Sequence, residues 1–236
     1  MKAIILAAGK GVRLKPLTDT TPKPLIKLAG IHIIDRIFVE LPDEIDEVIL
    51  VVEHLKEKLF DHVGEHYHGR TVRHVDQLSM RGTLGALFSA KPFIEPDERF
   101  LVLNGDDVYD KAELTECLQH DRVFGLQRMK MPGYYNIRLT KNGVVKGFFT
   151  QTESEVAHGA MVATGAYVVD AHIFDHQGIN VRAKQEFGLP ETMIAQKDDH
   201  PIHGVIMHKW LPINKFEHID SAEEILRSKR LHARGS

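Results

Sequence analysis

Cysteine is nearly absent from this chain: Cys117 is the single one among 236 residues. No disulfide can form within the chain, and we expect a protein of the reducing cytoplasm. No apolar run reaches the roughly 18 residues that a membrane span needs, and we expect no signal peptide before the first apolar segment. An excess of positive charge is also missing, since the formal net charge is −3. Composition therefore favours neither a membrane nor a nucleic acid as partner.

Short apolar segments alternate with segments of helical periodicity in the first half of the chain. The predicted strands are Lys2–Leu6, Val48–Val52, Thr71–Val75 and Phe100–Leu103, and the predicted helices are Ile33–Leu41, Leu55–Tyr67 and Gly82–Ala90. This alternation predicts an α/β fold: a Rossmann-like, mostly parallel (mixed) sheet covered by helices on both faces. In such sheets ligands bind at the carboxyl ends of the strands.

The second half has a different pattern. Three segments read as antiparallel strands, Phe124–Met129, Tyr135–Thr140 and Val144–Phe149, with a hairpin turn at Lys141-Asn142-Gly143. A further strand, Met161–Val169, and two helices, Phe187–Gln196 and Ala222–Arg230, follow. No linker or repeat divides the chain. We expect one domain, 1–236, made of halves 1–122 and 123–231 with a short tail, 232–236.

Two glycines and three basic residues follow the first strand. Ala7-Ala8-Gly9-Lys10-Gly11-Val12-Arg13 leads into a polar stretch that closes on Pro22-Lys23-Pro24. Glycines allow close approach of a ligand, and exposed backbone N–H groups and basic side chains bind phosphate oxygens. The two commonest phosphate loops do not fit, because GxxxxGK[ST] is absent and Leu14 replaces the third glycine of GxGxxG. The segment predicts a nucleotide-phosphate site of another kind.

Leu6 to Leu25 resembles LAAGxGxRLxPLTxxxPKPL, the signature of the sugar-1-phosphate nucleotidyltransferase (NDP-sugar pyrophosphorylase) family. The resemblance implies a glycosyltransferase-A-like nucleotidyltransferase fold, with half 1–122 binding the nucleotide and half 123–231 the acceptor. It implies a Mg²⁺ cofactor, with an NTP and a sugar 1-phosphate as substrates. Arg13 and Lys23 would be catalytic, and Leu6, Ala8, Gly9 and Gly11 would bind the nucleotide.

Two carboxylates end the strand Phe100–Leu103, in Asn104-Gly105-Asp106-Asp107. A carboxylate at a strand tip beside a phosphate loop is a natural Mg²⁺ ligand. The family carries Gly-Asp here, so the resemblance assigns Asp106 to the metal and to catalysis. The alternative is a turn residue that accepts backbone N–H bonds.

The segment from Gln77 to Thr83 resembles the family's QxxxxGT. The resemblance implies that Gln77, Gly82 and Thr83 bind the nucleotide, with Gln77 and the Gly82 backbone reading the base edge. An amide both donates and accepts, which suits uracil or thymine, so UTP or dTTP is favoured. The alternative for Gln77 is an ordinary loop residue before a helix.

The acceptor half departs from the family. A Glu-Lys-Pro that often holds the sugar and its phosphate is replaced by residues Phe148 to Thr152, and Tyr-Gly appears as Tyr135-Asn136. Thr164-Gly165-Ala166-Tyr167 resembles the (T/A)GxY strand. The resemblance therefore offers Tyr135, Asn136 and Gly165 as acceptor contacts, and Arg182 or Lys184 as the missing positive charge unless both are solvated.

Near the C-terminus, residues 217–225 resemble the family's DVGTPEDL, which supplies a second metal ligand. Ungapped, His218 takes the Asp position. Choline-phosphate cytidylyltransferase relatives with Ile-Asp-Ser favour Asp220, which we predict as the ligand. Alternatively, Asp220 or Ser221 caps a helix, with Glu223 or Glu224 completing a capping box.

The sequence thus predicts an enzyme that joins an NTP to a sugar 1-phosphate and releases pyrophosphate. A cytidylyltransferase or other nucleotidyltransferase for phosphocholine or another phospho-alcohol is one alternative, and a non-catalytic nucleotide-sugar sensor is another. Cys117 lies in a predicted helix without a paired histidine, so covalent catalysis is not expected. His62, His66 and His68 lack metal-site spacing and are interpreted as solvated surface. Homo-oligomer formation stays open.

Overall fold

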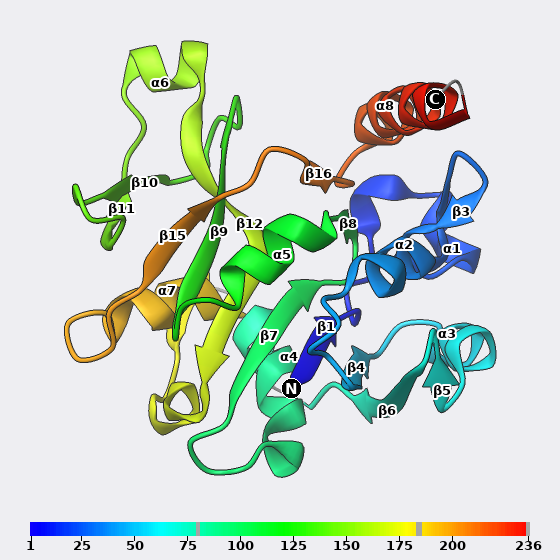
Figure 1. Cartoon of the computed structure of the whole chain (residues 1–236), viewed down its shortest axis with the longest axis horizontal. Coiled ribbons are helices and arrows are strands. Elements are labelled where there is room, and N and C mark those ends of the chain that lie inside the picture. The colour runs from blue at the N-terminus through cyan, green and yellow to red at the C-terminus, as the bar shows by residue number, and fades with distance from the viewer. Residues whose placement is uncertain (79–80, 183–185, 235–236) are drawn as a thin grey trace.

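Eight strands form one central sheet in the order β15-β9-β12-β7-β1-β4-β6-β5 (Figure 1). The computed structural model describes residues 1–78, 81–182 and 186–234. The strands of the sheet are β1 (Lys2–Leu6), β4 (Glu47–Val52), β5 (His66–Tyr67), β6 (Arg70–Asp76), β7 (Arg99–Asn104), β9 (Val123–Met129), β12 (Ala160–Asp170) and β15 (His203–Ile206). Strands from both halves of the chain therefore share one sheet.

The sheet is mixed, as predicted. β7, β1, β4 and β6 are parallel, with Leu6 opposite both Val51 and Asn104. β12 runs antiparallel to both of its neighbours, β7 and β9, and β15 is parallel to β9. The parallel part is the one in which carboxyl ends of neighbouring strands meet at a common edge.

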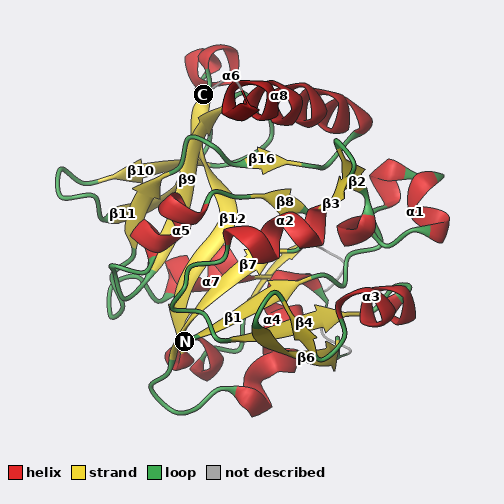
Figure 2. Cartoon of the chain, turned by 45° about the vertical axis from the view of Figure 1, so that its right-hand side comes forward, coloured by secondary structure: helices red, strands yellow, loops and turns green. Residues whose placement is uncertain are grey.

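Successive residues of the central strands pack into different cores, because side chains alternate between the two faces. Ile5, Leu50 and Leu101 pack with the apolar residues of α2 (Ile33–Glu40), α3 (Lys56–Val63) and α5 (Lys111–Cys117). Ile4 and Val102 pack on the other face with α4 (Gly82–Ala90) and α7 (Leu189–Ala195). Figures 1 and 2 show these helices on opposite sides of the sheet. Helices on both faces explain why these strands read as continuous apolar runs.

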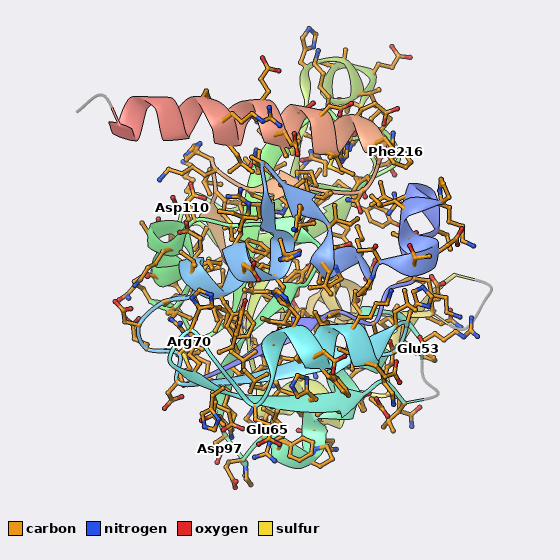
Figure 3. The ribbon with its side chains drawn as sticks, turned by 90° about the vertical axis from the view of Figure 1, so that its right-hand side faces the viewer. Glu53, Glu65, Arg70, Asp97, Asp110 and Phe216 are labelled. Atoms are coloured by element: carbon orange, nitrogen blue, oxygen red, sulfur yellow. The ribbon has the colours of Figure 1, made fainter. Side chains whose placement is uncertain are left out.

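Shorter elements surround the sheet. The remaining helices are α1 (Leu17–Thr20), α6 (Glu153–His158) and α8 (Phe216–Arg234), with 3₁₀ turns at Val12–Leu14, Lys23–Leu25, Lys91–Phe93 and Ala171–Asp175. The small strand pairs are β2 (Lys27–Leu28) with β3 (Ile31–His32), β8 (Asp107–Val108) with β16 (Leu211–Pro212), β10 (Asn136–Leu139) with β11 (Val145–Phe149), and β13 (Ile179–Arg182) with β14 (Glu186–Gly188). Figure 3 shows α8 across one end of the molecule, with Phe216 at its start. No helix within the described ranges is both long and apolar enough to cross a membrane.

The predicted elements are present, with four differences. The predicted helix Leu55–Tyr67 ends at Val63, because Gly64 adopts a φ of +65° and His66–Tyr67 pairs with β6. The helix predicted from Phe187 begins at Leu189, since the Phe187 N–H donates to Arg81 O at 2.9 Å. α8 begins at Phe216 and not near Ala222. β9 joins the central sheet, whereas β10 and β11 form the predicted hairpin by themselves.

His66 and His68 are exposed as predicted, whereas His62 is only partly exposed and has a partner that the surface interpretation did not include. The His62 side chain is 26% exposed, and its Nε2 lies 2.6 Å from Asp35 Oδ1. Sequence spacing did not reveal this contact, because α2 and α3 meet only in the folded chain.

Candidate active site

A cavity of about 870 Å³ lies at the carboxyl ends of β1, β4, β6 and β7, where the sequence places the ligand. It is lined by residues that follow each of these strands: Ala8 after β1, Glu53 after β4 (labelled in Figure 3), Gln77 after β6 and Asp106 after β7. A smaller cavity of about 200 Å³, the loop cavity, lies under the glycine loop and shares Leu6, Gly9, Arg13, Asp106 and Asn214 with it. We call the larger one the main cavity.

The glycine loop is shaped by its two glycines in different ways. Gly11 has a φ of +60°, and a Cβ there would lie 2.8 Å from Thr18 Cγ2. Its carbonyl accepts hydrogen bonds from Leu14 N at 2.8 Å and Thr18 Oγ1 at 2.9 Å, which fix the turn. Gly9 has no atom within 4 Å of a built Cβ and lines both cavities. Gly11 is thus needed for the backbone, whereas Gly9 leaves space that a ligand can occupy.

A polar cluster of four side chains lies where the two cavities meet. The Lys23 ammonium, only 6% exposed as a residue, donates to Asp106 and, at 3.3 Å, to Asn214 Oδ1. Arg13 Nη2 donates to the same Asn214 oxygen at 3.1 Å. Oxygen atoms of Asp106 and Asn214 therefore both contact the Lys23 ammonium. The positively charged groups of Lys23 and Arg13 both line the loop cavity.

Asp107, next to this cluster, is in a different environment. It is 2% exposed, and its Oδ1 accepts a hydrogen bond from Ile213 N at 3.3 Å. Burial and the neighbouring charge of Asp106 raise the pKa of Asp107 well above the usual range of a carboxyl. The β8–β16 pair holds Asp107 and Ile213 together, and so places Asn214, which follows Ile213, beside Asp106.

The predicted base-reading residues also line the main cavity, with added structural roles. Gly82 begins α4 with a φ of +90°, and a Cβ there would lie 2.3 Å from Phe187 O. Thr83 Oγ1 accepts a hydrogen bond from Leu189 N at 2.9 Å. The Gln77 backbone N–H donates to Val52 O at 2.8 Å, which fixes the residue at the end of β6. Gln77, Gly82 and Thr83 therefore come together at one wall of the cavity.

A third cavity, of about 200 Å³, opens beside the main one and shares Asn104, Asp107, Tyr134 and Asn214 with it. We call it the side cavity. Among the described residues its lining has two carboxyls, Asp107 and Glu191, but no lysine, arginine or histidine, and its aromatic members are Tyr134, Tyr135, Phe148, Tyr167 and Trp210. Tyr135 and Phe148 are stacked, with ring centroids 5.1 Å apart. Its wall is thus aromatic and acidic.

Only some of the residues predicted to contact the acceptor line a cavity. Tyr135 and Gly165 line the side cavity. Gly165 has a φ of +77°, and a Cβ there would collide with the Asn104 side chain. Asn136 is not among the lining residues: its side chain is buried, donates to Glu155 Oε1 at 2.5 Å and accepts from Met161 N at 3.2 Å. Lys184 lies outside the described residues.

The structure brings Asn214, not Asp220, to Asp106. Asp220 is exposed within α8, and the cavities are not lined by it. Neither Asp220 nor Ser221 is an N-cap, since α8 has already begun at Phe216. His218 Nδ1 accepts the Asn214 N–H at 3.2 Å, and burial lowers the pKa of His218, helped by Lys215. Sequence reasoning missed Asn214, and the signal available was only a polar residue after a short apolar segment.

Cys117 has no place in this site. It is buried in α5, and burial raises the pKa of its thiol to about 12. A thiol held in this state is a poor nucleophile, which agrees with the expectation of non-covalent chemistry.

Comparison with known proteins identifies the family. The model of the family described as nucleotidyl transferase matches residues 2–197. The chain belongs to this family. It is 32% identical over 210 residues to the bifunctional protein GlmU of Methanocaldococcus jannaschii, covering 88% of this chain and 46% of that protein. It is also 32% identical over 123 residues to the UTP–glucose-1-phosphate uridylyltransferase AglF of Haloferax volcanii, covering 52% of this chain and 49% of that protein.

The chain spans about half the length of the curated relatives it matches. Among solved structures, a UDP-glucose pyrophosphorylase complexed with UDP-glucose superposes with a TM-score of 0.80 at 19% identity, over 97% of this chain and 98% of the other. This likeness confirms the predicted nucleotidyltransferase fold.

Proposed function

We propose that this nucleotidyl transferase joins an NTP to a sugar 1-phosphate and releases pyrophosphate. The observation that carries the proposal is the cluster of Lys23, Arg13, Asp106 and Asn214 at the junction of the cavities. An oxygen of the acceptor phosphate attacks the α-phosphorus in line, the P–O bond to the β-phosphate breaks, and pyrophosphate leaves with that electron pair. Such a reaction needs positioning and fixed positive charge more than covalent help from the protein.

The roles of the chain's own residues follow from their places. The glycine loop, with Leu6, Ala8, Gly9 and Gly11, binds the triphosphate through backbone N–H groups. Lys23 and Arg13 neutralise charge that develops on the α-phosphate and on the departing pyrophosphate. We assign residues 1–122 to the nucleotide and residues 123–231 to the acceptor, with Tyr135 and Gly165 as acceptor contacts in the side cavity.

The oxygens of Asp106 and Asn214 fit a Mg²⁺ ion. Both are ligands of the type that this hard cation prefers, and both line the main cavity and the loop cavity where these meet. The side chain of Asp106 is 31% exposed at the cavity wall, so an ion can reach it. When bound, Mg²⁺ would neutralise phosphate charge and orient the two substrates. Asn214 takes the place that the sequence assigned to Asp220.

We favour UTP or dTTP because Gln77 lies on the wall of the main cavity with Gly82 and Thr83. The Gln77 amide can accept from N3–H of uracil or thymine and donate to the neighbouring carbonyl. AglF is named for UTP and glucose 1-phosphate, which agrees with this choice. Gln77→Glu, which cannot donate, should weaken use of UTP by about 1–3 kcal/mol in transition-state binding, measured as kcat/KM. A wild-type preference for GTP or ATP would contradict the assignment.

A phospho-alcohol with a cationic head, such as phosphocholine, is a second candidate acceptor. Five aromatic rings and two carboxyls line the side cavity, and no described lysine, arginine or histidine does. Aromatic faces attract quaternary ammonium groups. The same aromatic wall also suits stacking against a sugar, so the lining supports both acceptors.

One experiment separates the candidates. Each of the four common NTPs and dTTP is combined with glucose 1-phosphate, N-acetylglucosamine 1-phosphate and phosphocholine, and pyrophosphate release is measured with Mg²⁺. Turnover with a sugar 1-phosphate supports the main proposal, and turnover with phosphocholine alone supports the second. Nucleotide binding without turnover for any pair would favour a non-catalytic sensor.

We propose the cytoplasm as the location, because the fold contains no disulfide and its single cysteine, Cys117, is buried.

A further inference from the structure

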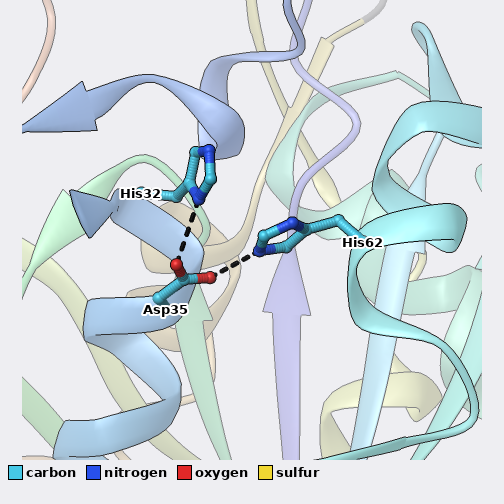
Figure 4. A group of neighbouring side chains, drawn as sticks. All are labelled: His32, Asp35 and His62. Atoms are coloured by element: carbon cyan, nitrogen blue, oxygen red, sulfur yellow. Dashed lines mark hydrogen bonds and ion pairs between the residues drawn. The ribbon is translucent and has the colours of Figure 1, made fainter. Parts of the chain in front are cut away.

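Two histidines converge on one aspartate outside the three cavities described above. Figure 4 shows His32, at the junction of β3 and α2, and His62, in the last turn of α3, both pointing at the carboxylate of Asp35. His32 Nδ1 lies 3.0 Å from Asp35 Oδ2, and His62 Nε2 lies 2.6 Å from Asp35 Oδ1. His32 and Asp35 are three residues apart at the start of α2, whereas His62 comes from α3, 27 residues after Asp35, so the third side chain joins them only because α2 and α3 pack on the same face of the sheet.

The three side chains have the chemistry and spacing of metal ligands. One ligand atom from each, two imidazole nitrogens and one carboxylate oxygen, lies within 4.8 Å of the others. Two ligand atoms of a tetrahedral site with bonds of 2.0–2.1 Å are about 3.4 Å apart. His32 Nδ1 lies 3.0 Å from Asp35 Oδ2 and His62 Nε2 lies 2.6 Å from Asp35 Oδ1, so each nitrogen must move away from the carboxylate by less than about 1 Å for an ion to enter between them. Small side-chain rotations suffice for this.

The surroundings also fit a bound ion. The side chains of His32, Asp35 and His62 are 23%, 21% and 26% exposed, so solvent reaches the cluster and water can complete the coordination. Tyr67 OH donates to Asp35 Oδ1 at 2.8 Å, which is how an outer partner orients a ligating carboxylate. The rings of His32 and His62 meet edge to face, with centroids 4.5 Å apart, so the two imidazoles are already close together.

We propose that His32, Asp35 and His62 bind a divalent transition-metal ion of the Zn²⁺ class, at a site separate from the active site. Two imidazoles and one carboxylate favour Zn²⁺ over Mg²⁺, which prefers oxygen ligands alone. On binding, the ion takes the place of the proton that each facing nitrogen shares with Asp35, and that proton moves to the other ring nitrogen or to solvent. The ion links the start of α2 to the end of α3, and so stabilises the folded chain.

A second His/Asp group in the described part of the chain is a poorer site. Asp170, His172 and His200 also lie within reach of one another. Arg122, however, holds both carboxylate oxygens of Asp170, through Nε at 2.7 Å and Nη2 at 2.5 Å. A metal there would compete with a buried guanidinium, so this group provides a matched negative control.

The test is a Zn²⁺ titration of the full chain, made without an affinity tag and stripped of metal, in competition with a chromophoric chelator. Several millimolar Mg²⁺ is present, to occupy the oxygen ligands of the active site. We expect one tight equivalent of Zn²⁺. His62→Gln and Asp35→Asn should each weaken it by more than the roughly 10–100-fold that loss of an outer partner costs, and Tyr67→Phe should weaken it by about that amount. His172→Gln should leave the affinity unchanged.

A second readout does not depend on the chelator. Free Zn²⁺ at 100 times the Kd should raise the Tm of the wild-type chain by about 5–10 °C. His62→Gln, shown to be folded by circular dichroism without metal, should lose this shift. The proposal is overturned if no stoichiometric Zn²⁺ binding occurs, if His62→Gln binds as tightly as the wild type, or if His172→Gln is the variant that loses the ion. None of these outcomes bears on nucleotidyl transfer, which is tested separately by pyrophosphate release.

Discussion

Lys23 is almost out of contact with water, yet its ammonium faces two oxygen atoms on a cavity wall. Removing a lysine from water is costly unless its charge is paired, and Asp106 supplies that pair. Asn214 adds a second, uncharged oxygen that it shares between Lys23 and Arg13. A ligand with negative phosphates can interact with both Lys23 and Arg13, because hydrogen bonds to Asn214 already hold the two side chains in place.

Lys23→Ala is expected to lower kcat by about 10²–10³-fold, the usual cost of removing one preorganised charge beside a developing anion. Pyrophosphate release under saturating substrates measures this. Lys27→Ala is the matched control, since Lys27 lies four residues away and is exposed. Equal activities for the two variants would take Lys23 out of the catalytic set.

Asp106→Asn and Asn214→Ala should each raise the Mg²⁺ concentration needed for half-maximal activity, with Asp106→Asn the more severe because it removes a charge that a hard cation favours. Asp220→Asn should leave this concentration unchanged, since Asp220 is exposed within α8. Asp107→Asn should cost less than Asp106→Asn, because an amide oxygen can still accept the Ile213 N–H. Mg²⁺ titrations of the four variants give the answer. A loss confined to Asp220→Asn would restore the register that the sequence favoured.

Single residues were predictable where many neighbours constrained them. Gly9, Gly11, Arg13 and Lys23 stand in one segment whose spacing carries the signal, and all four line the loop cavity. Asn214 stands after β16, a strand of two residues that leaves no periodicity to read. Its position depends on the pairing of β16 with β8, a contact between residues about one hundred positions apart. Local sequence does not encode such a contact in a readable form.

At the scale of elements, long periodic segments were the predictable ones. α4 has the predicted bounds, and β1 does as well, because both are apolar and bounded by breaks in the pattern. The helix predicted as Leu55–Tyr67 was too long because its C-terminal residues form β5 against β6. A contact between distant segments also explains Gly82. The sequence linked this glycine only to the base of the nucleotide, but a side chain there would collide with the backbone of Phe187.

A buried ion pair between Arg122 and Asp170 joins the start of β9 to the end of β12. The dependence of stability on pH therefore tests how much this contact between two strands contributes. Burial alone would raise the pKa of Asp170, but the hydrogen bonds and charge of Arg122 outweigh it and lower that pKa. Arg122 is 1% exposed, so Asp170→Asn leaves an unpaired buried charge and should cost about 3–5 kcal/mol at pH 7. Denaturation in urea measures this free energy of unfolding.

The pH dependence has a definite sign. A carboxyl whose pKa is lowered by folding contributes fully above its unfolded pKa, and this contribution is lost as the pH falls through the lowered value. The difference in stability between the wild type and Asp170→Asn should therefore stay constant from pH 7 to about pH 5 and shrink as the pH falls below about 4. Asp121→Asn is the control, since Asp121 is 98% exposed in its pair with Arg99 and should change stability by less than about 1 kcal/mol. A difference that grows in acid would contradict this account.

At the scale of the whole molecule, the two halves of the chain are interleaved. β12, from the second half, lies between β7 and β9, and its Ala166 pairs with Leu103 of the first half. The core on one face contains Ala3 and Leu101 together with Val168 and Ile213. The sequence suggested one continuous domain only because no linker was visible. The structure adds a physical reason to expect one domain: residues 1–122 by themselves would expose the edge of β7 and part of both cores.

Interleaving predicts that the chain unfolds in one cooperative step, although at 236 residues it exceeds the size at which two-state unfolding is usual. Trp210 is the single tryptophan and lies in the second half, so its fluorescence follows that half, whereas far-ultraviolet circular dichroism follows the whole chain. The two probes should give the same midpoint in urea, and the calorimetric enthalpy should equal the van't Hoff enthalpy. Two separate transitions, or a folded and soluble fragment 1–122, would show that the halves are independent units. The contact between β7 and β12 would then be an interface between two halves that are each stable alone.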